Sequence, residues 1–190
     1  MNDYDAIPYD AGRAFPETHP GHLAVLGRLF GLESADPQRC RVLELGCASG
    51  QNLIPMAWYA PGSAFLGVEL SRTQARAGGD LIRELGLSNI EILHGDILDL
   101  PRDLGEFDYI LANGVYSWVP PAVRDGIMAL CARRLAPQGI AYISFNTLPG
   151  WRQRGMLRDM LLYQTRNAVS PAERLRQAQG FLATFAAALE

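Results

Sequence analysis

A glycine-containing turn at residues 44–50 holds the first side chains that could do chemistry. It reads ELGCASG and follows the short apolar run RVLEL at residues 41–45. Glycines after a strand allow a ligand to approach the backbone closely, and they allow the next helix to begin beneath it. The two glycines stand four residues apart, unlike the Gly-x-Gly-x-x-Gly spacing of dinucleotide-binding turns. A tight turn that binds nothing is the alternative interpretation.

Glu44 separates two classes of nucleotide ligand. A carboxylate beside the turn would repel a pyrophosphate and would favour a cation such as an ammonium group. S-adenosylmethionine carries an amino-acid tail and a sulfonium and has no phosphate. Glu44 therefore favours S-adenosylmethionine over a nicotinamide dinucleotide, and the alternative is that it is a solvated or capping acid.

Two more acids follow later apolar runs. Glu69 ends the run FLGVEL, 19 residues beyond Gly50, where an acid can accept hydrogen bonds from both ribose hydroxyls. Asp96, in HGDIL, stands where an acid could bind an adenine amino group, or it could be a turn aspartate. Acids after three consecutive strands favour an adenosine-binding edge.

The elements that must position these acids alternate between strands and helices. The sequence predicts strands over residues 41–45, 64–70, 90–94, 107–113 and 140–146. It predicts helices over residues 20–30, 51–59, 71–85, 121–138, 151–167 and 171–189. This pattern is typical of an α/β fold with a Rossmann-like, doubly wound, mostly parallel sheet and helices on both faces. Ligands of such sheets bind beyond the carboxyl ends of the strands.

The chain divides into three predicted parts. Residues 1–31 form an N-terminal arm and helix, residues 32–150 the ligand-binding core, and residues 151–190 two C-terminal helices. The aromatic side chains of the arm, at Tyr4, Tyr9 and Phe15, could cover the ligand as a lid or could serve packing alone.

Composition excludes several functions. All 17 basic residues are arginine, so a phosphate-binding loop of the Gly-Lys-Ser/Thr type and a Schiff-base lysine are ruled out. A net charge of −3 offers no attraction to nucleic acid. The three cysteines show no metal or disulfide spacing, which predicts reduced thiols and a cytoplasmic protein. No apolar run reaches about 18 residues, so no membrane span is expected.

ELGCASG, FLGVEL and HGDIL resemble the first three motifs of class I S-adenosylmethionine-dependent methyltransferases. Longer segments, among them CRVLELGCASGQNLIPMA, GEFDYILANGVYSWVP and ISFNTLPGW, resemble one subgroup of that class. The subgroup carries a C-terminal methyltransferase regulatory domain and includes the rickettsial protein lysine methyltransferases. The resemblance covers roughly residues 9–165.

The resemblance implies a set of ligand contacts. The methionine part would be held by Glu44, Gly46, Cys47, Ala48, Gly50 and Asn52. The ribose and adenine would be held by Glu69, Leu70, Asp96 and Ile97. Asn113 would close the cofactor side of the acceptor site. Two departures are visible: Ala48 replaces a common glycine, which is tolerable if its φ is negative, and Glu69 replaces the more usual aspartate.

The implied reaction is an in-line methyl transfer to an amine acceptor, with protein lysine as the favoured substrate. No protein nucleophile is required, because the cofactor carries the chemistry. Asn113 and Tyr116 are the candidates to orient the acceptor, with Trp118 and Asn146 as further lining. The three histidines are expected to be structural or solvated, with His19 the strongest candidate for an exception.

Several alternatives stay open. The chain could be a non-catalytic module that binds S-adenosylmethionine and acts with a C-terminal regulatory domain, or it could methylate a small molecule. Methylation of adenine in nucleic acid is disfavoured, because residues 113–116 read NGVY and do not resemble the Asn-Pro-Pro-Tyr motif of the enzymes that catalyse it.

The C-terminal end raises a further expectation. The resemblance implies a sheet of seven strands, whereas only five strands are predicted from this sequence. A truncated protein is therefore expected. The apolar side of the last helix would then contact the regulatory region or a second copy of the chain.

Overall fold

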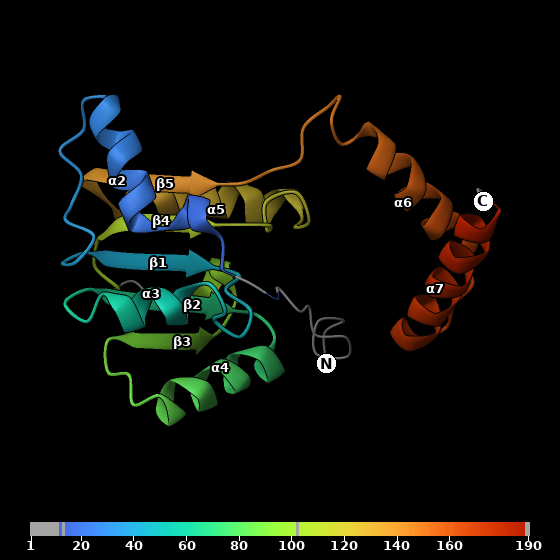
Figure 1. Cartoon of the computed structure of the whole chain (residues 1–190), viewed down its shortest axis with the longest axis horizontal. Coiled ribbons are helices and arrows are strands. Elements are labelled where there is room, and N and C mark those ends of the chain that lie inside the picture. Colours follow the sequence, from blue (N-terminus) through green and yellow to red (C-terminus); the bar gives the residue numbers. More distant parts are fainter. Residues whose placement is uncertain (1–11, 13, 102, 189–190) are drawn as a thin grey trace. The chain divides into compact units, whose positions relative to one another are not determined.

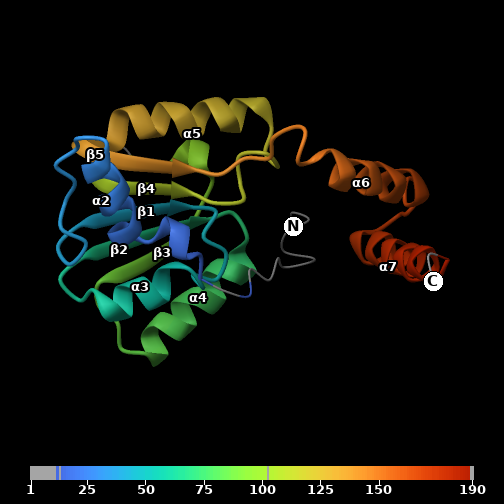
Figure 2. The same ribbon diagram turned by 45° about the horizontal axis from the view of Figure 1, so that its top comes forward.

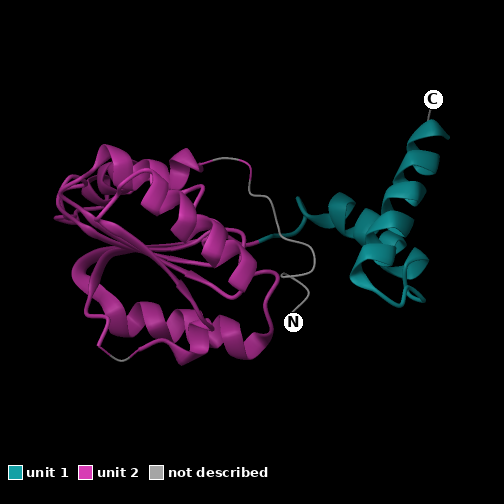
Figure 3. Cartoon of the chain, turned by 90° about the horizontal axis from the view of Figure 1, so that it is seen from below, with its two compact units in different colours: residues 1–7, 146–190 teal, residues 8–145 magenta. Residues whose placement is uncertain are grey.

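A computed structural model gives the fold of residues 12, 14–101 and 103–188. Contacts divide the chain into two compact units, which Figure 3 shows in different colours. One lies within Pro8–Phe145 and the other contains Asn146–Glu190. The predicted boundaries after residues 31 and 150 stay predictions. Among the described residues, no helix combines the length and the apolar character needed to cross a bilayer.

In the described residues, the first unit contains one sheet of five parallel strands, in the order β3-β2-β1-β4-β5 (Figure 1). The strands are β1 (Arg41–Leu45), β2 (Ala64–Glu69), β3 (Ile90–His94), β4 (Phe107–Ala112) and β5 (Leu135–Ile143). The strand order reverses between β1 and β4, and ligands of open α/β sheets bind beyond the strand ends at such a point. The predicted Rossmann-like, doubly wound fold is confirmed.

Helices cover both faces of the sheet (Figure 2). They are α2 (Pro20–Leu29), α3 (Leu53–Tyr59), α4 (Arg72–Glu84) and α5 (Pro121–Arg134). Helices α2, α3 and α4 share one buried cluster with Val42 of β1, whereas α5 shares another with Leu43 and Leu45. Because alternate strand residues point to opposite faces, Glu44 lies on the face of Val42, beneath α2 and α3.

The buried face of α2 differs from the predicted one. The apolar spacing predicts a core face made of Leu23, Leu26, Leu29 and Phe30. The last three are 40%, 76% and 85% exposed. The buried residues of α2 are Pro20, Leu23, Ala24 and Gly27. A β-carbon at Gly27 would lie 2.8 Å from Cδ1 of Ile140, so α2 lies too close to the sheet for larger side chains to fit.

Strand β5 begins five residues earlier than the predicted strand over 140–146, because α5 ends at Arg134 and β5 follows directly. Leu135 pairs with Phe107 and Ile140 pairs with Tyr109, so β5 advances five residues where β4 advances two. The extra residues form a bulge that includes the Pro-Gln-Gly sequence at 137–139. Proline is tolerated at such a position because it needs no ladder partner, and Pro with Gly in sequence is typical of a turn.

The second unit contains two helices, α6 (Arg152–Gln164) and α7 (Pro171–Ala187). At the start of α7, Ser170 Oγ accepts from the Glu173 amide at 3.2 Å and caps the helix, and Glu173 Oε2 accepts from the Val169 amide at 3.1 Å. On α7, Leu175, Leu182 and Phe185 are 43%, 37% and 38% exposed. The contact predicted for this apolar side stays a prediction.

Candidate functional site

Glu44 lies in β1 between Gly67 of β2 and Leu111 of β4. Its side chain is buried, and burial raises the pKa of its carboxyl to about 7, although a hydrogen bond from Asn52 opposes the shift. Glu44 Oε1 accepts this bond from Nδ2 of Asn52 at 2.8 Å. Glu44 Oε2 is buried and has no hydrogen-bond partner among the described residues. A buried carboxylate oxygen of this kind calls for a donor, and a ligand cation would be one.

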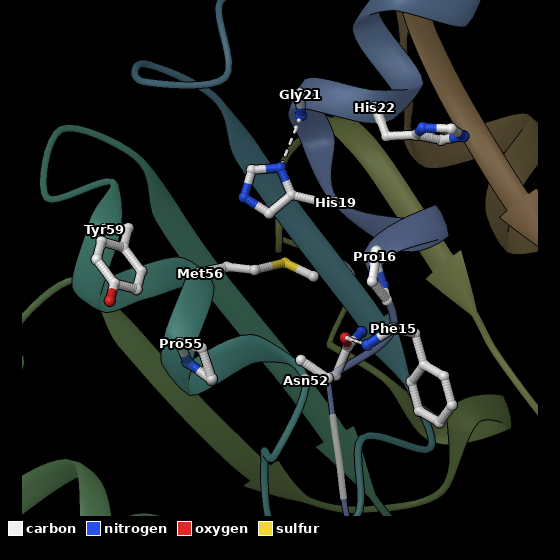
Figure 4. Close-up of a pocket in the computed structure, with 10 residues that line it drawn as sticks. Phe15, Pro16, His19, Gly21, His22, Asn52, Pro55, Met56 and Tyr59 are labelled. Atoms are coloured by element: carbon white, nitrogen blue, oxygen red, sulfur yellow. Dashed lines mark hydrogen bonds between the residues drawn. The ribbon is translucent and has the colours of Figure 1, made fainter.

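Asn52 connects Glu44 to η1 (Pro16–Thr18), the 3₁₀ turn before α2. Asn52 Nδ2 also donates to Thr18 Oγ1 at 3.0 Å. Asn52 Oδ1 accepts from the backbone N–H of Phe15 at 2.9 Å, and Figure 4 shows these two residues together. Both amide hydrogens of Asn52 are therefore used within the protein. The predicted contact between Asn52 and a ligand carboxylate would require one of these bonds to be exchanged.

Gly46 and Gly50 give the turn its shape. Their φ angles are +70° and +79°, in the left-handed region that favours glycine. A β-carbon at Gly46 would lie 2.6 Å from Cγ2 of Val115. The turn after β1 is thus packed directly against the segment after β4, which also carries Tyr116.

The backbone of Ala48 is in the left-handed region, although its side chain is not that of glycine. An alanine in place of glycine is tolerable there if its φ is negative, whereas the structure has +51°. The backbone N–H of Ala48 donates to Oε2 of Glu69 at 2.9 Å, which holds the peptide in this orientation. A left-handed conformation costs an L-residue about 1–2 kcal/mol, so the bond to Glu69 opposes local strain.

Glu69 ends β2 and joins two segments. Its Oε2 accepts from Ala48, and its Oε1 accepts from the backbone N–H of Ser71 at 2.7 Å. Ser71 in turn begins α4, because its hydroxyl accepts from the Gln74 amide at 3.3 Å. A carboxylate has about four acceptor positions, so these two bonds leave capacity for ribose hydroxyls. Leu70, predicted to lie against adenine, is 44% exposed.

Asp96 follows β3 close to the end of β2, since the Gly95 amide donates to the Glu69 carbonyl at 2.9 Å. Asp96 Oδ1 accepts from the Leu98 amide at 2.9 Å and begins η2 (Ile97–Asp99). Asp96 is therefore a turn aspartate, which is one of the two interpretations that the sequence left open. Ile97 packs on the α5 side of the sheet, and the adenine contacts of Asp96 and Ile97 stay predictions.

Aromatic side chains gather after β4 and β5. The Tyr116 ring lies 6.2 Å from the Phe145 ring and 5.8 Å from the guanidinium carbon of Arg124. Tyr116 packs partly against the α5 core, whereas Phe145 and Trp118 are 61% and 49% exposed. Asn113 is half-buried at the start of this segment, and Asn146 falls in the second unit.

A cavity of about 510 Å³ lies between η1, α2 and α3 (Figure 4). Its walls are mostly apolar, and Asn52 is its only lining residue that belongs to the predicted contact set. His19 Nδ1 accepts from the Gly21 amide at 3.0 Å and caps α2, so this histidine has a structural role. Of the arm aromatics, Tyr4 and Tyr9 lie outside the described residues.

All three cysteines are buried and free. Burial raises the pKa of the Cys47 thiol well above its usual range, and the charges of Glu44 and Glu69 act in the same direction. Cys47 therefore stays protonated, and its predicted contribution is through its backbone.

Thr18 is the site residue that sequence reasoning missed. It is 0% exposed, and its hydroxyl lies between the Asn52 amide and the Phe15 carbonyl, to which it donates at 2.8 Å. No motif marks it, because a threonine before a helix-opening proline has the appearance of an ordinary turn residue.

Comparison with known proteins adds to this geometry. A family model described as "Methyltransferase domain" matches residues 42–139, which run from β1 into the bulge of β5. The uncharacterized protein RP789 of Rickettsia prowazekii is 44% identical over 94% of this chain, and RP028 of the same organism is 38% identical over 93%.

A solved structure is also similar along most of the chain. PKMT2 from Rickettsia typhi, in complex with AdoHcy, matches with a TM-score of 0.82 and 38% identity over 96% of this chain. The chain spans 35% of that protein, 32% of RP789 and 70% of RP028.

Proposed function

The chain belongs to the methyltransferase domain family, and from this premise we propose that it binds S-adenosylmethionine and methylates an amine, that of a protein lysine. The observation that carries the proposal is the buried Oε2 of Glu44, which has no hydrogen-bond partner in the part of the chain that the structure describes and lies beside a glycine turn. The similarity to PKMT2, crystallised with AdoHcy, supports the cofactor and favours the acceptor.

The residues present fit this cofactor. Glu44 offers a carboxylate to the ammonium group of the methionine part, and the backbone of residues 46–50 offers close approach. Glu69 retains acceptor positions that we assign to the ribose, and we assign Leu70, Asp96 and Ile97 to the adenine. A dinucleotide fits less well, because Glu44 would oppose its pyrophosphate.

When bound, S-adenosylmethionine supplies a methyl group on a sulfonium, and its transfer to a neutral amine leaves S-adenosylhomocysteine and a proton. The task of this chain is alignment and exclusion of water, and alignment alone can lower a barrier by roughly 7–11 kcal/mol. Gly46 and Val115 are in contact, so the cofactor turn and the acceptor segment are held together.

On the acceptor side, Asn113 and Tyr116 orient the amine. A lysine with a pKa of about 10.4 must lose its proton before it reacts. The guanidinium of Arg124 beside Tyr116 disfavours a second cation there, and this favours the neutral amine.

Calorimetry with S-adenosylhomocysteine and with NAD tests the cofactor. We expect S-adenosylhomocysteine to bind and NAD to give no measurable heat. Binding of NAD in preference to S-adenosylhomocysteine would contradict the proposal and favour a nicotinamide oxidoreductase.

Transfer of a radiolabelled methyl group to lysine-containing peptides tests the reaction. The chain contains no lysine, so any label on it must be on its N-terminal amine or on another residue type. Cofactor binding without transfer to peptides or small amines would favour the non-catalytic module, whereas transfer to small amines alone would favour a small-molecule enzyme. Contact with a C-terminal regulatory region or a second copy, and a cytoplasmic location, also belong to the proposal.

A further inference from the structure

The hydroxyl of Thr18 lies two hydrogen bonds from the Glu44 carboxylate, through Asn52. We propose that Thr18 and Asn52 are positioning residues that hold the Glu44 carboxylate with Oε2 facing the ammonium group of the cofactor. The proposal rests on the proposed function, and it assigns a role to a residue outside every motif of the sequence.

The Asn52 amide is fixed at both ends. Asn52 Oδ1 accepts from the backbone of Phe15, and the two hydrogens of Nδ2 go to Thr18 and Glu44. Rotation of the amide by half a turn would place hydrogens against the Phe15 N–H and an oxygen against the Glu44 carboxylate. Asn52 therefore always presents a donor to Glu44.

That donor decides which carboxylate oxygen is available. Glu44 Oε1 is bonded to Asn52, which leaves Oε2 as the buried acceptor without a partner among the described residues. A carboxylate held in one rotamer binds a cation without an ordering cost at the moment of binding. Loss of the Thr18 hydroxyl would leave one Nδ2 hydrogen unbonded and would weaken the set of bonds that holds the amide and, through it, the Glu44 carboxylate.

The competing explanation is that Thr18 serves the fold alone. Its hydroxyl also bonds the Phe15 carbonyl at 2.8 Å, and this bond could stabilise η1 without any effect on the ligand. The two explanations differ in which part of the cofactor is affected. Positioning of Glu44 concerns only the amino-acid tail, whereas a general loss of structure would weaken adenosine binding as well.

The experiment compares S-adenosylhomocysteine with 5′-methylthioadenosine, which has the adenosine part and no amino-acid tail. Thr18→Val keeps the shape of the side chain and removes the hydroxyl. We expect it to weaken S-adenosylhomocysteine binding about tenfold, the equivalent of one or two hydrogen bonds, and to change 5′-methylthioadenosine binding less than about twofold. Thr18→Ser should restore binding.

Thr165→Val is the matched control. Thr165 is also buried, at 3% exposed, and its hydroxyl donates to the Leu161 carbonyl at 2.8 Å, far from Glu44 in sequence. This variant should lower stability without changing the affinity for either ligand. Equal weakening of both ligands by Thr18→Val, or no weakening of either, would overturn the proposal.

Hydrogen exchange on the unaltered protein provides a second test that needs no variant. Binding at Glu44 and the bond between Phe15 and Asn52 should be coupled, and coupling is reciprocal. S-adenosylhomocysteine should slow exchange of the Phe15 amide about tenfold more than 5′-methylthioadenosine does, in line with a coupling of 1–3 kcal/mol. Equal protection by the two ligands would contradict the proposal. If neither ligand binds the unaltered protein, the proposed function itself fails.

Discussion

The two halves of the sheet edge are built in different ways. At the ends of β1 and β2, the polar side chains are buried and bonded: Thr18, Glu44 and Asn52 are 0%, 4% and 4% exposed. At the ends of β4 and β5, the side chains are aromatic and open, with Trp118 at 49% and Phe145 at 61%.

The difference matches the two tasks that the proposed function requires. A small charged ligand is bound tightly only where polar groups are already in position, because ordering them at binding costs affinity. A macromolecular acceptor needs an accessible surface, and exposed aromatic side chains are typical of surfaces that bind protein. The buried half is therefore expected to govern cofactor affinity, and the open half is expected to govern transfer.

Glu44→Gln should have the largest effect on this comparison. The variant keeps an acceptor for Asn52 but removes the negative charge from the buried half. We expect the affinity for S-adenosylhomocysteine to fall between about 30-fold and several thousand-fold, since loss of one partner of a buried charge pair costs about 2–5 kcal/mol. Calorimetry measures the change.

Glu91→Gln is the matched control for that prediction. Glu91 is an exposed carboxylate on β3 of the same sheet, and its change should leave the dissociation constant unaltered. If both variants bind as tightly as the unaltered protein, the division between the two halves is wrong.

The pH dependence of stability is the second prediction. The pKa of Glu44 is about 7 in the folded protein, against 4.5 for an ordinary glutamate, so the folded state holds a proton that the unfolded state releases earlier. Without ligand, the free energy of unfolding should therefore fall as pH rises from about 4.5 to about 7, by about 3 kcal/mol in total. Cys47 does not titrate in this window, because its pKa is raised well above 9.

Urea unfolding across this pH range measures the effect, with Glu44→Gln as the reference, since it lacks the group. Binding of S-adenosylhomocysteine should have the opposite dependence, because the ionised carboxylate is the form that pairs with an ammonium group. If the free energy of unfolding depends on pH in the same way in the unaltered protein and in Glu44→Gln, groups other than Glu44 cause the dependence.

The sequence predicts the buried half well where its signals are local. The glycine turn and the acids at the strand ends each occupy a few consecutive residues, and these residue types have few uses at a strand-to-helix junction. Thr18 could not be found in this way, because its partner Asn52 is 34 residues away and neither residue marks the other.

Two other features that the sequence does not reveal, the φ of Ala48 and the start of β5, also depend on contacts between residues far apart in the chain. The φ of Ala48 depends on a bond to Glu69, 21 residues along the chain, and sequence preference alone favours a negative value. The early start of β5 depends on pairing of Leu135 with Phe107, which overrides the turn preference of residues 137–139. Long-range contacts decided each case.

Tyr116→Phe tests the open half. The phenyl ring retains its packing with Phe145 and Arg124, and only the hydroxyl is lost. If the hydroxyl orients the acceptor, single-turnover transfer at saturating cofactor should slow about tenfold, the effect of about 1.4 kcal/mol. The affinity for S-adenosylhomocysteine should stay the same.

Tyr59→Phe is the control for the open half, since Tyr59 is 76% exposed on α3, in a different segment of the chain from Tyr116. Its transfer rate should equal that of the unaltered protein. Unchanged rates for Tyr116→Phe and for Asn113→Ala together would exclude both residues as the group that orients the acceptor.

Ala48→Gly should have the smallest effect, and it asks whether the buried half stores strain. At φ +51° a glycine is relaxed and an alanine is not, so the substitution should raise the free energy of unfolding by about 1 kcal/mol. The control is Ala77→Gly, at an exposed position of α4, where glycine should cost about 0.5–1 kcal/mol. The two substitutions are chemically identical, so opposite signs in urea unfolding would isolate the backbone conformation as the cause. If Ala48→Gly also loses stability, the bond from Ala48 to Glu69 holds an unstrained turn. The rigidity of the buried half would then come from its hydrogen bonds alone.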